Sequence, residues 1–154
     1  MTPTTRARGD AGQVGGIEAL PFGLLIFVLG SLLIANAWAV VDAKFATDSA
    51  ARQAARTFVE GSDPDQALSD AIAAGRDAIA GHGRDPDQAR IVALGSPTLV
   101  RCERVSFEAT YEVPALSLPL IGGFGRSPFR VRSTHTELVD PFRDGLAGQA
   151  EDCT

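Results

Sequence analysis

The chain has 154 residues, a formal net charge of −5 and two cysteines. Its basic side chains are spread along the sequence, so it lacks the basic patch with which proteins bind nucleic acid. Once one long uncharged segment is set aside, the remaining length is enough for a single small domain.

Residues 1–16 are polar and glycine-rich and show neither helical nor strand periodicity. Such a sequence cannot bury enough apolar surface to offset the entropy that ordering costs. We therefore expect a disordered arm or leader, on the cytoplasmic side of a membrane in the orientation given below.

The segment Ala19–Val41 contains no charged side chain. As a helix it would be about 34 Å long, enough to cross a hydrocarbon core of about 30 Å. The alternative is a cleavable signal sequence, which has a shorter apolar core and small residues at its end, such as Ala35-Asn36-Ala37 here. The length favours a retained transmembrane helix, with Trp38 near its outer interface.

Small residues recur every four positions along this helix, which favours close packing of another helix. Chance is the alternative, because alanine is abundant in the chain. The residues of this ridge are Ser31, Ala35, Ala39 and Ala43.

Helical periodicity continues past the apolar segment and predicts one helix over residues 17–60, whose outer half is the spine of the soluble domain. Gly61 is expected to follow it as the C′ residue. The apolar stripe expected to face the core comprises Phe45, Ala51, Ala55, Phe58 and Val59.

A second helix is predicted to begin at Pro64, with Asp63 as its N-cap, and to end at Gly81. The pentapeptide Asp63-Pro64-Asp65-Gln66-Ala67 recurs as Asp85-Pro86-Asp87-Gln88-Ala89. The second copy runs into a strand-like segment. We interpret the recurrence as reuse of local capping chemistry.

The rest of the chain predicts β-structure. Strands are expected over 90–100, interrupted by glycine and proline, over 105–113, where apolar and polar residues alternate, and over 129–139. The apolar loop 116–124 either forms a contact surface or folds back onto the core. With residues 61–140 as an extracytoplasmic domain and 141–154 as a loose tail, the predicted fold class is α+β: a long transmembrane helix that continues into a domain of one further helix and about three antiparallel strands.

Residues with catalytic or metal-binding chemistry are few. His82 and His135 have no second ligand at metal spacing and no nucleophile–base pattern around them. The glycine-rich segment 122–125 lacks the residues of a phosphate loop. Arg126, Arg130 and Arg132 are expected to form a solvated face that pairs with Glu108 and Glu112 across the sheet; an anion site is the alternative. We predict no catalytic residue, metal site, cofactor or small-molecule substrate.

Cys102 and Cys153 both follow the apolar segment. In an extracytoplasmic domain a disulfide between them is favoured, and it would stabilise the fold by roughly 4 kcal/mol. Two unrelated free thiols are the alternative.

The order of a glycine-containing arm, a glutamate before an uncharged helix and a small β-rich domain resembles a type IV pilin, in particular the TadE-like minor pilins, or pseudopilins, of the tight-adherence (Flp, type IVb) pilus system. The motif is Gly12-Gln13-Val14-Gly15-Gly16-Ile17-Glu18 followed by Ala19-Leu20-Pro21-Phe22. The resemblance is strongest over residues 9–58.

The resemblance implies that a prepilin peptidase cuts after Gly12, so that Gln13 begins the mature chain and Glu18 is its sixth residue, where the family has glutamate fifth. It also implies that Glu18 pairs with the amino terminus of a neighbouring subunit. An anchor that is not cleaved is the alternative. The expected protein is a non-catalytic, single-pass component of pilus assembly with its N-terminus in the cytoplasm and with the membrane and other pilus subunits as partners. The alternative is a membrane-anchored binding or adaptor protein unrelated to pili.

Overall fold

A computed structural model describes residues 19–114, 116–118, 122–124, 129–149 and 153. The processing candidates Gly12, Gln13 and Glu18 lie outside the described residues, as does Arg126. The chain divides into two compact units, residues 1–35 and 36–154. In the first unit the described residues are helical and most of their side chains are exposed.

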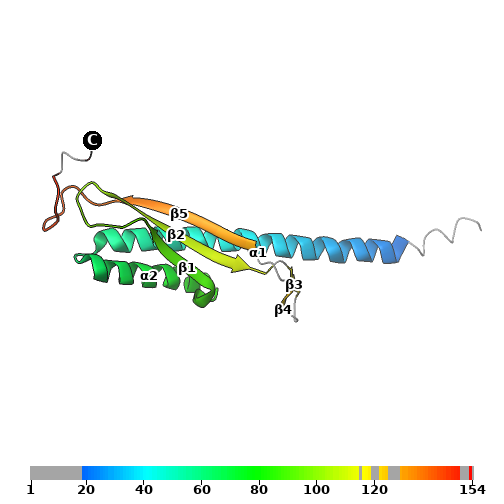
Figure 1. The fold of residues 1–154 in the computed structure, drawn as a ribbon. Coiled ribbons are helices and arrows are strands. Elements are labelled where there is room, and N and C mark those ends of the chain that lie inside the picture. The colour runs from blue at the N-terminus through cyan, green and yellow to red at the C-terminus, as the bar shows by residue number, and fades with distance from the viewer. Residues whose placement is uncertain (1–18, 115, 119–121, 125–128, 150–152, 154) are drawn as a thin grey trace, which may run out of the picture. The chain divides into compact units, whose positions relative to one another are not determined.

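The predicted α+β fold is confirmed. Helix α1 spans Ala19–Glu60 and helix α2 spans Pro64–Gly81, and a short 3-10 turn, η2, covers Pro86–Gln88. A three-stranded antiparallel sheet has the order β1-β2-β5 (Figure 1), and β3 pairs with β4 in a small hairpin. The strand bounds are Ala89–Leu94 (β1), Arg104–Val113 (β2), Leu116–Leu118 (β3), Gly122–Phe124 (β4) and Phe129–Leu138 (β5).

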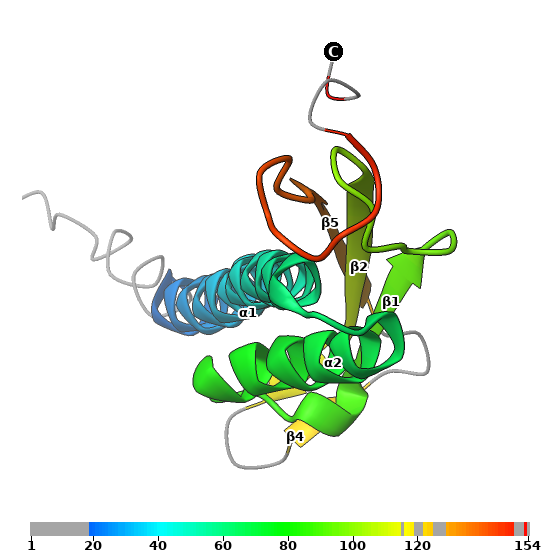
Figure 2. The same ribbon diagram turned by 90° about the vertical axis from the view of Figure 1, so that its left-hand side faces the viewer.

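In the second unit, α2 and the later turns of α1 lie side by side on one face of the sheet (Figure 2). The buried face of α1 is made almost entirely of alanine, spaced three and four residues apart as one side of a helix requires. Small side chains let the helix approach the sheet closely. The buried residues are Ala43, Ala46, Thr47, Ala50, Ala51, Ala54, Ala55 and Phe58.

The stripe expected on α1 is therefore only partly right. Ala51, Ala55 and Phe58 are buried, whereas the side chain of Phe45 is 63% exposed. Phe45 lies about 100° around the helix from the nearest buried alanines, since each residue advances that far. Phe58 instead supplies the aromatic contact of the core, with its ring centroid 5.7 Å from that of Phe107 on β2.

The predicted start of α2 is confirmed. Asp63 is the N-cap, its carboxylate accepts from the backbone N–H of Gln66, and Pro64 is the first helical residue. Asp85 caps the η2 turn in the same way, through the N–H of Asp87. The recurrent pentapeptide thus supplies two local caps, as interpreted.

Gly61 follows the last residue of α1, but it is not among the residues with a positive φ. A Cβ atom there would lie 2.3 Å from Cβ of Ala67. Glycine is needed at this position because α2 turns back close to the end of α1.

The strand predictions require three corrections. β1 ends at Leu94, before Gly95, whose φ of 83° carries the chain out of the strand. The segment 116–124 was expected to be a loop, and it contains the paired strands β3 and β4. The tail expected over 141–154 is not loose in its described part: Leu146 packs against the core, and Val100 bridges to Ala147. The alternation predicted for β2 is confirmed, because its odd-numbered residues from Val105 to Val113 are buried.

Candidate functional site

The most prominent candidate for a functional surface is the apolar part of α1. It is the one helix among the described residues that is long and apolar enough to cross a membrane, by length and composition, and none of its most apolar 18-residue window is buried inside the protein. Exposing this many large apolar side chains to water is unfavourable. Such a surface needs lipid or another protein against it.

The small-residue ridge has two parts in the structure. Ser31 and Ala35 are exposed, whereas Ala39 is partly buried against the core and Ala43 is fully buried in it. The last two residues of the ridge therefore pack within the α+β domain. The first two, Ser31 and Ala35, remain accessible to another helix.

Arg84, in the loop after α2, binds α1 near the end of the apolar segment. Its Nη2 donates to Oδ2 of Asp42 at 2.7 Å and to the backbone carbonyl of Ala39 at 2.8 Å. Its guanidinium also lies 5.2 Å from the ring centroid of Tyr111 on β2. One side chain thus joins the helix, the loop and the sheet, and a charge-assisted contact of this kind is strong when partly buried.

Lys44, the only lysine in the chain, joins α1 to the edge strand β5. Its Nζ donates to the carbonyl of Arg132 at 2.6 Å and to Oγ of Ser133 at 2.7 Å. The hydroxyl of Thr47, one turn further along α1, is 3.0 Å from the same Ser133 oxygen. Polar partners therefore satisfy the buried hydroxyls of Thr47 and Ser133 and set the position of the helix along the strand.

The C-terminal segment closes the other end of α1. The guanidinium of Arg143 donates to the carbonyls of Val59 and Glu60, which have no partner inside the helix. A cation at this end also interacts favourably with the helix dipole. A disulfide between Cys102 and Cys153 ties this segment to the turn before β2, where Cys102 has a φ of 67°.

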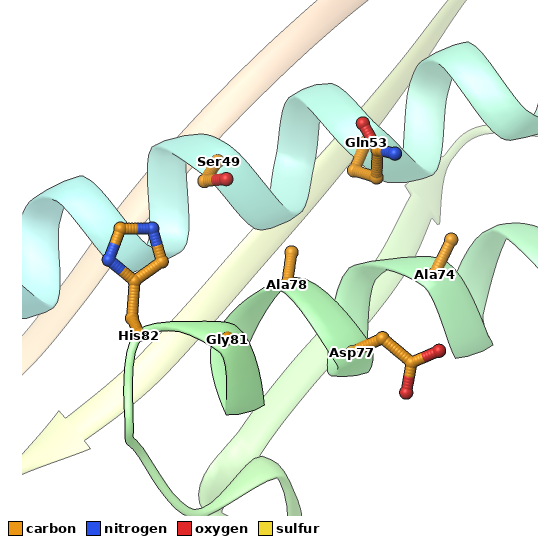
Figure 3. Close-up of a pocket in the computed structure, with 7 residues that line it drawn as sticks. All are labelled: Ser49, Gln53, Ala74, Asp77, Ala78, Gly81 and His82. Atoms are coloured by element: carbon orange, nitrogen blue, oxygen red, sulfur yellow. The ribbon is translucent and has the colours of Figure 1, made fainter.

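A shallow depression between α1 and α2 is lined in part by His82, with Ser49 and Gln53 of α1 facing Ala74 and Ala78 of α2 (Figure 3). His135 lies elsewhere, on β5, with Nε2 3.1 Å from Oε2 of Glu137. The two histidines are therefore on different elements and do not form a common site. Within the described part of the chain, no group of three potential metal ligands comes together.

The solvent face of the sheet carries a ladder of ion pairs. Arg130 binds Glu112 at 2.9 Å and Arg132 binds Glu108 at 3.3 Å, from β5 to β2. This pairing confirms the expectation for these two arginines. Both arginine side chains are largely exposed, so the ladder is a solvated surface that contributes little to stability.

Comparison of the chain with protein-family models, curated proteins and solved structures finds no match.

Sequence reasoning missed the roles of Arg84, Lys44 and Arg143, three cations whose hydrogen bonds join α1 to other parts of the domain. The unique lysine was a usable signal, because it stands among alanines on a helix face that becomes buried. For the two arginines no local signal exists, since their partners on α1 lie more than 40 residues away.

Proposed function

We propose that this protein is a non-catalytic, single-pass membrane component of pilus assembly, similar to TadE-like minor pilins or pseudopilins. The observation that supports the proposal is that the two parts of α1 have different surfaces. Its first part is uncharged and exposed, and its second part is the alanine-faced spine of a small α+β domain. The N-terminus is cytoplasmic and the α+β domain extracytoplasmic in this proposal, an environment in which the Cys102–Cys153 disulfide is stable.

The working surfaces in this proposal are protein contacts. Ser31 and Ala35 allow another helix to approach the apolar segment. Glu18, at the entrance of that segment, pairs with the new amino terminus of a neighbouring subunit after cleavage behind Gly12. In low dielectric such a pair is far stronger than in water, which makes Glu18 the residue to test.

The experiment compares the parent protein with Glu18→Ala in cells that carry the pilus system. We expect the parent in sheared surface filaments and the variant in the membrane only. Asp10→Ala is the matched control, because it removes a carboxylate from the part of the leader that cleavage discards, and it should leave filament recovery unchanged. If both variants and the parent stay in the membrane, the adaptor function unrelated to pili is favoured.

A further inference from the structure

Phe129, the first residue of β5, lies on the core-facing side of the sheet, two and four residues before the buried Val131 and Ser133. Its own side chain is nevertheless 57% exposed. On the edge strand β5 the buried residues therefore begin only after Phe129, although its partner on β2, Val113, is buried. An exposed aromatic ring is left at that end of the sheet.

The hydrogen bonds between α1 and β5 show how far along the helix Phe129 lies. Ser133 is bonded to Lys44 and Thr47, and further along in the same direction Arg143 reaches Glu60. Four strand residues back from Ser133 span about 13 Å, at about 3.3 Å per residue. That distance equals about nine helical residues, which, counted back from Thr47, puts Phe129 at the level of Trp38.

Trp38 is the only tryptophan in the chain and its side chain is 71% exposed, and Val41, one turn later, is 45% exposed. Trp38 lies near the end of the uncharged segment, where aromatic residues are typical of a lipid–water interface. The β3–β4 hairpin connects β2 to β5 at this same end of the sheet (Figure 1), and its strands have the apolar sequences Leu-Ser-Leu and Gly-Gly-Phe.

We propose that the end of the domain marked by Phe129 lies in the lipid headgroup region beside Trp38, so that the domain contacts the membrane surface as well as being anchored by α1. The occupant is lipid because the exposed ring lies level with the end of the apolar segment. The inference rests on the proposed membrane anchor and adds an orientation: the Arg143 end of the domain points away from the bilayer.

The test uses tryptophan fluorescence of the full chain in phosphatidylcholine vesicles, with and without lipids brominated near the headgroup. Trp38→Phe removes the native probe, and Phe129→Trp then places the only indole at the proposed contact. Phe142→Trp in the same background is the matched control. Phe142 is 82% exposed and adjoins Arg143 at the far end of α1, about 30 Å further along the helix.

We expect brominated lipid to quench the Phe129→Trp probe to an extent comparable with native Trp38, and to leave the Phe142→Trp probe unchanged. If Trp38 is quenched and the Phe129→Trp probe is not, the lipid contact is wrong and the anchor stands. If Trp38 itself is not quenched, both the anchor and the contact are wrong.

A second measurement needs no substitution. Vesicles that carry a lipid with a photoactivatable group near the headgroup are irradiated with the native chain, and tryptic peptides are analysed by mass. Lipid adducts are expected on peptide 127–130, which contains Phe129, and not on peptide 133–143, which contains Phe142. Adducts on the peptide ending at Lys44 without any on 127–130 overturn the proposal.

Discussion

Lys44 on α1 and Ser133 on β5 are joined by a hydrogen bond of 2.7 Å from Nζ to Oγ. The Ser133 side chain is almost fully buried, so it needs partners from the helix that covers it. The bond holds the spine helix in register with the edge strand. Lys44 also donates a hydrogen bond to the backbone carbonyl of Arg132 on the same edge strand. Free backbone carbonyls on an edge strand can pair with another strand.

Lys44→Met keeps the aliphatic stem and removes both hydrogen bonds. We expect a loss of about 1–2 kcal/mol in the free energy of unfolding, because a buried acceptor loses its donor. Chemical denaturation of the full chain in detergent micelles measures it. Arg52→Met is the control: Arg52 forms an exposed ion pair with Asp48, and its loss should be within about 0.5 kcal/mol. Equal effects of the two changes would refute a structural role for Lys44.

Arg84→Gln should cost about 2 kcal/mol of unfolding free energy, because three contacts, with Asp42, Ala39 and Tyr111, are lost together. Arg84→Lys should recover less than half of the loss, since an ammonium group cannot bind the carboxylate and the carbonyl with the same planar fork. For comparison, Arg76 forms a longer, exposed ion pair with Asp87, and Arg76→Gln should change little. Full recovery with Arg84→Lys would show that charge alone matters there.

Gly61→Ala should destabilise the domain by about 1–3 kcal/mol through overpacking, because the new methyl group would overlap Ala67. Gly81→Ala is the matched change at the last residue of α2, where nothing lies within 4 Å of a built Cβ. The helix propensity of alanine predicts a neutral or slightly stabilising effect there, of at most about 1 kcal/mol. Thermal unfolding of both variants separates the two cases, and a stable Gly61→Ala protein would contradict the close approach.

Removal of the disulfide by the paired changes Cys102→Ser and Cys153→Ser should cost about 4 kcal/mol in the chain-entropy model. In that background Arg143→Gln should have a smaller effect than in the parent, because the segment that carries Arg143 is already less constrained. The four proteins form a double-mutant cycle, read by denaturation. Additive losses would show that the disulfide and the Arg143 contact with α1 act independently.

Local signals made much of the fold predictable. The α2 cap at Asp63, the alternation along β2 and the long apolar run of α1 each depend on residues close in sequence. Phe45 was misplaced because aromatic residues were given more weight than the alanines that form the buried face. Phe45 follows Ala43 and precedes Ala46, and it lies off the face of α1 that those buried alanines form.

The contacts that hold α1 in place could not be predicted, because each joins residues far apart in sequence. Lys44 meets Ser133 across 89 positions and Arg143 meets Glu60 across 83. The tail was misjudged for the same reason: its composition resembles a linker, and only the folded chain brings it to the end of α1. The position of β5 along α1 follows from these hydrogen bonds between residues that are far apart in sequence. The level of Phe129 along the helix follows from it.

The most direct test of the proposed function is the intact mass of the protein recovered from sheared surface filaments of cells that express an active prepilin peptidase. The proposal predicts a chain that begins at Gln13, with the disulfide between Cys102 and Cys153 formed. A full-length chain confined to the membrane fraction and absent from the filaments would contradict it.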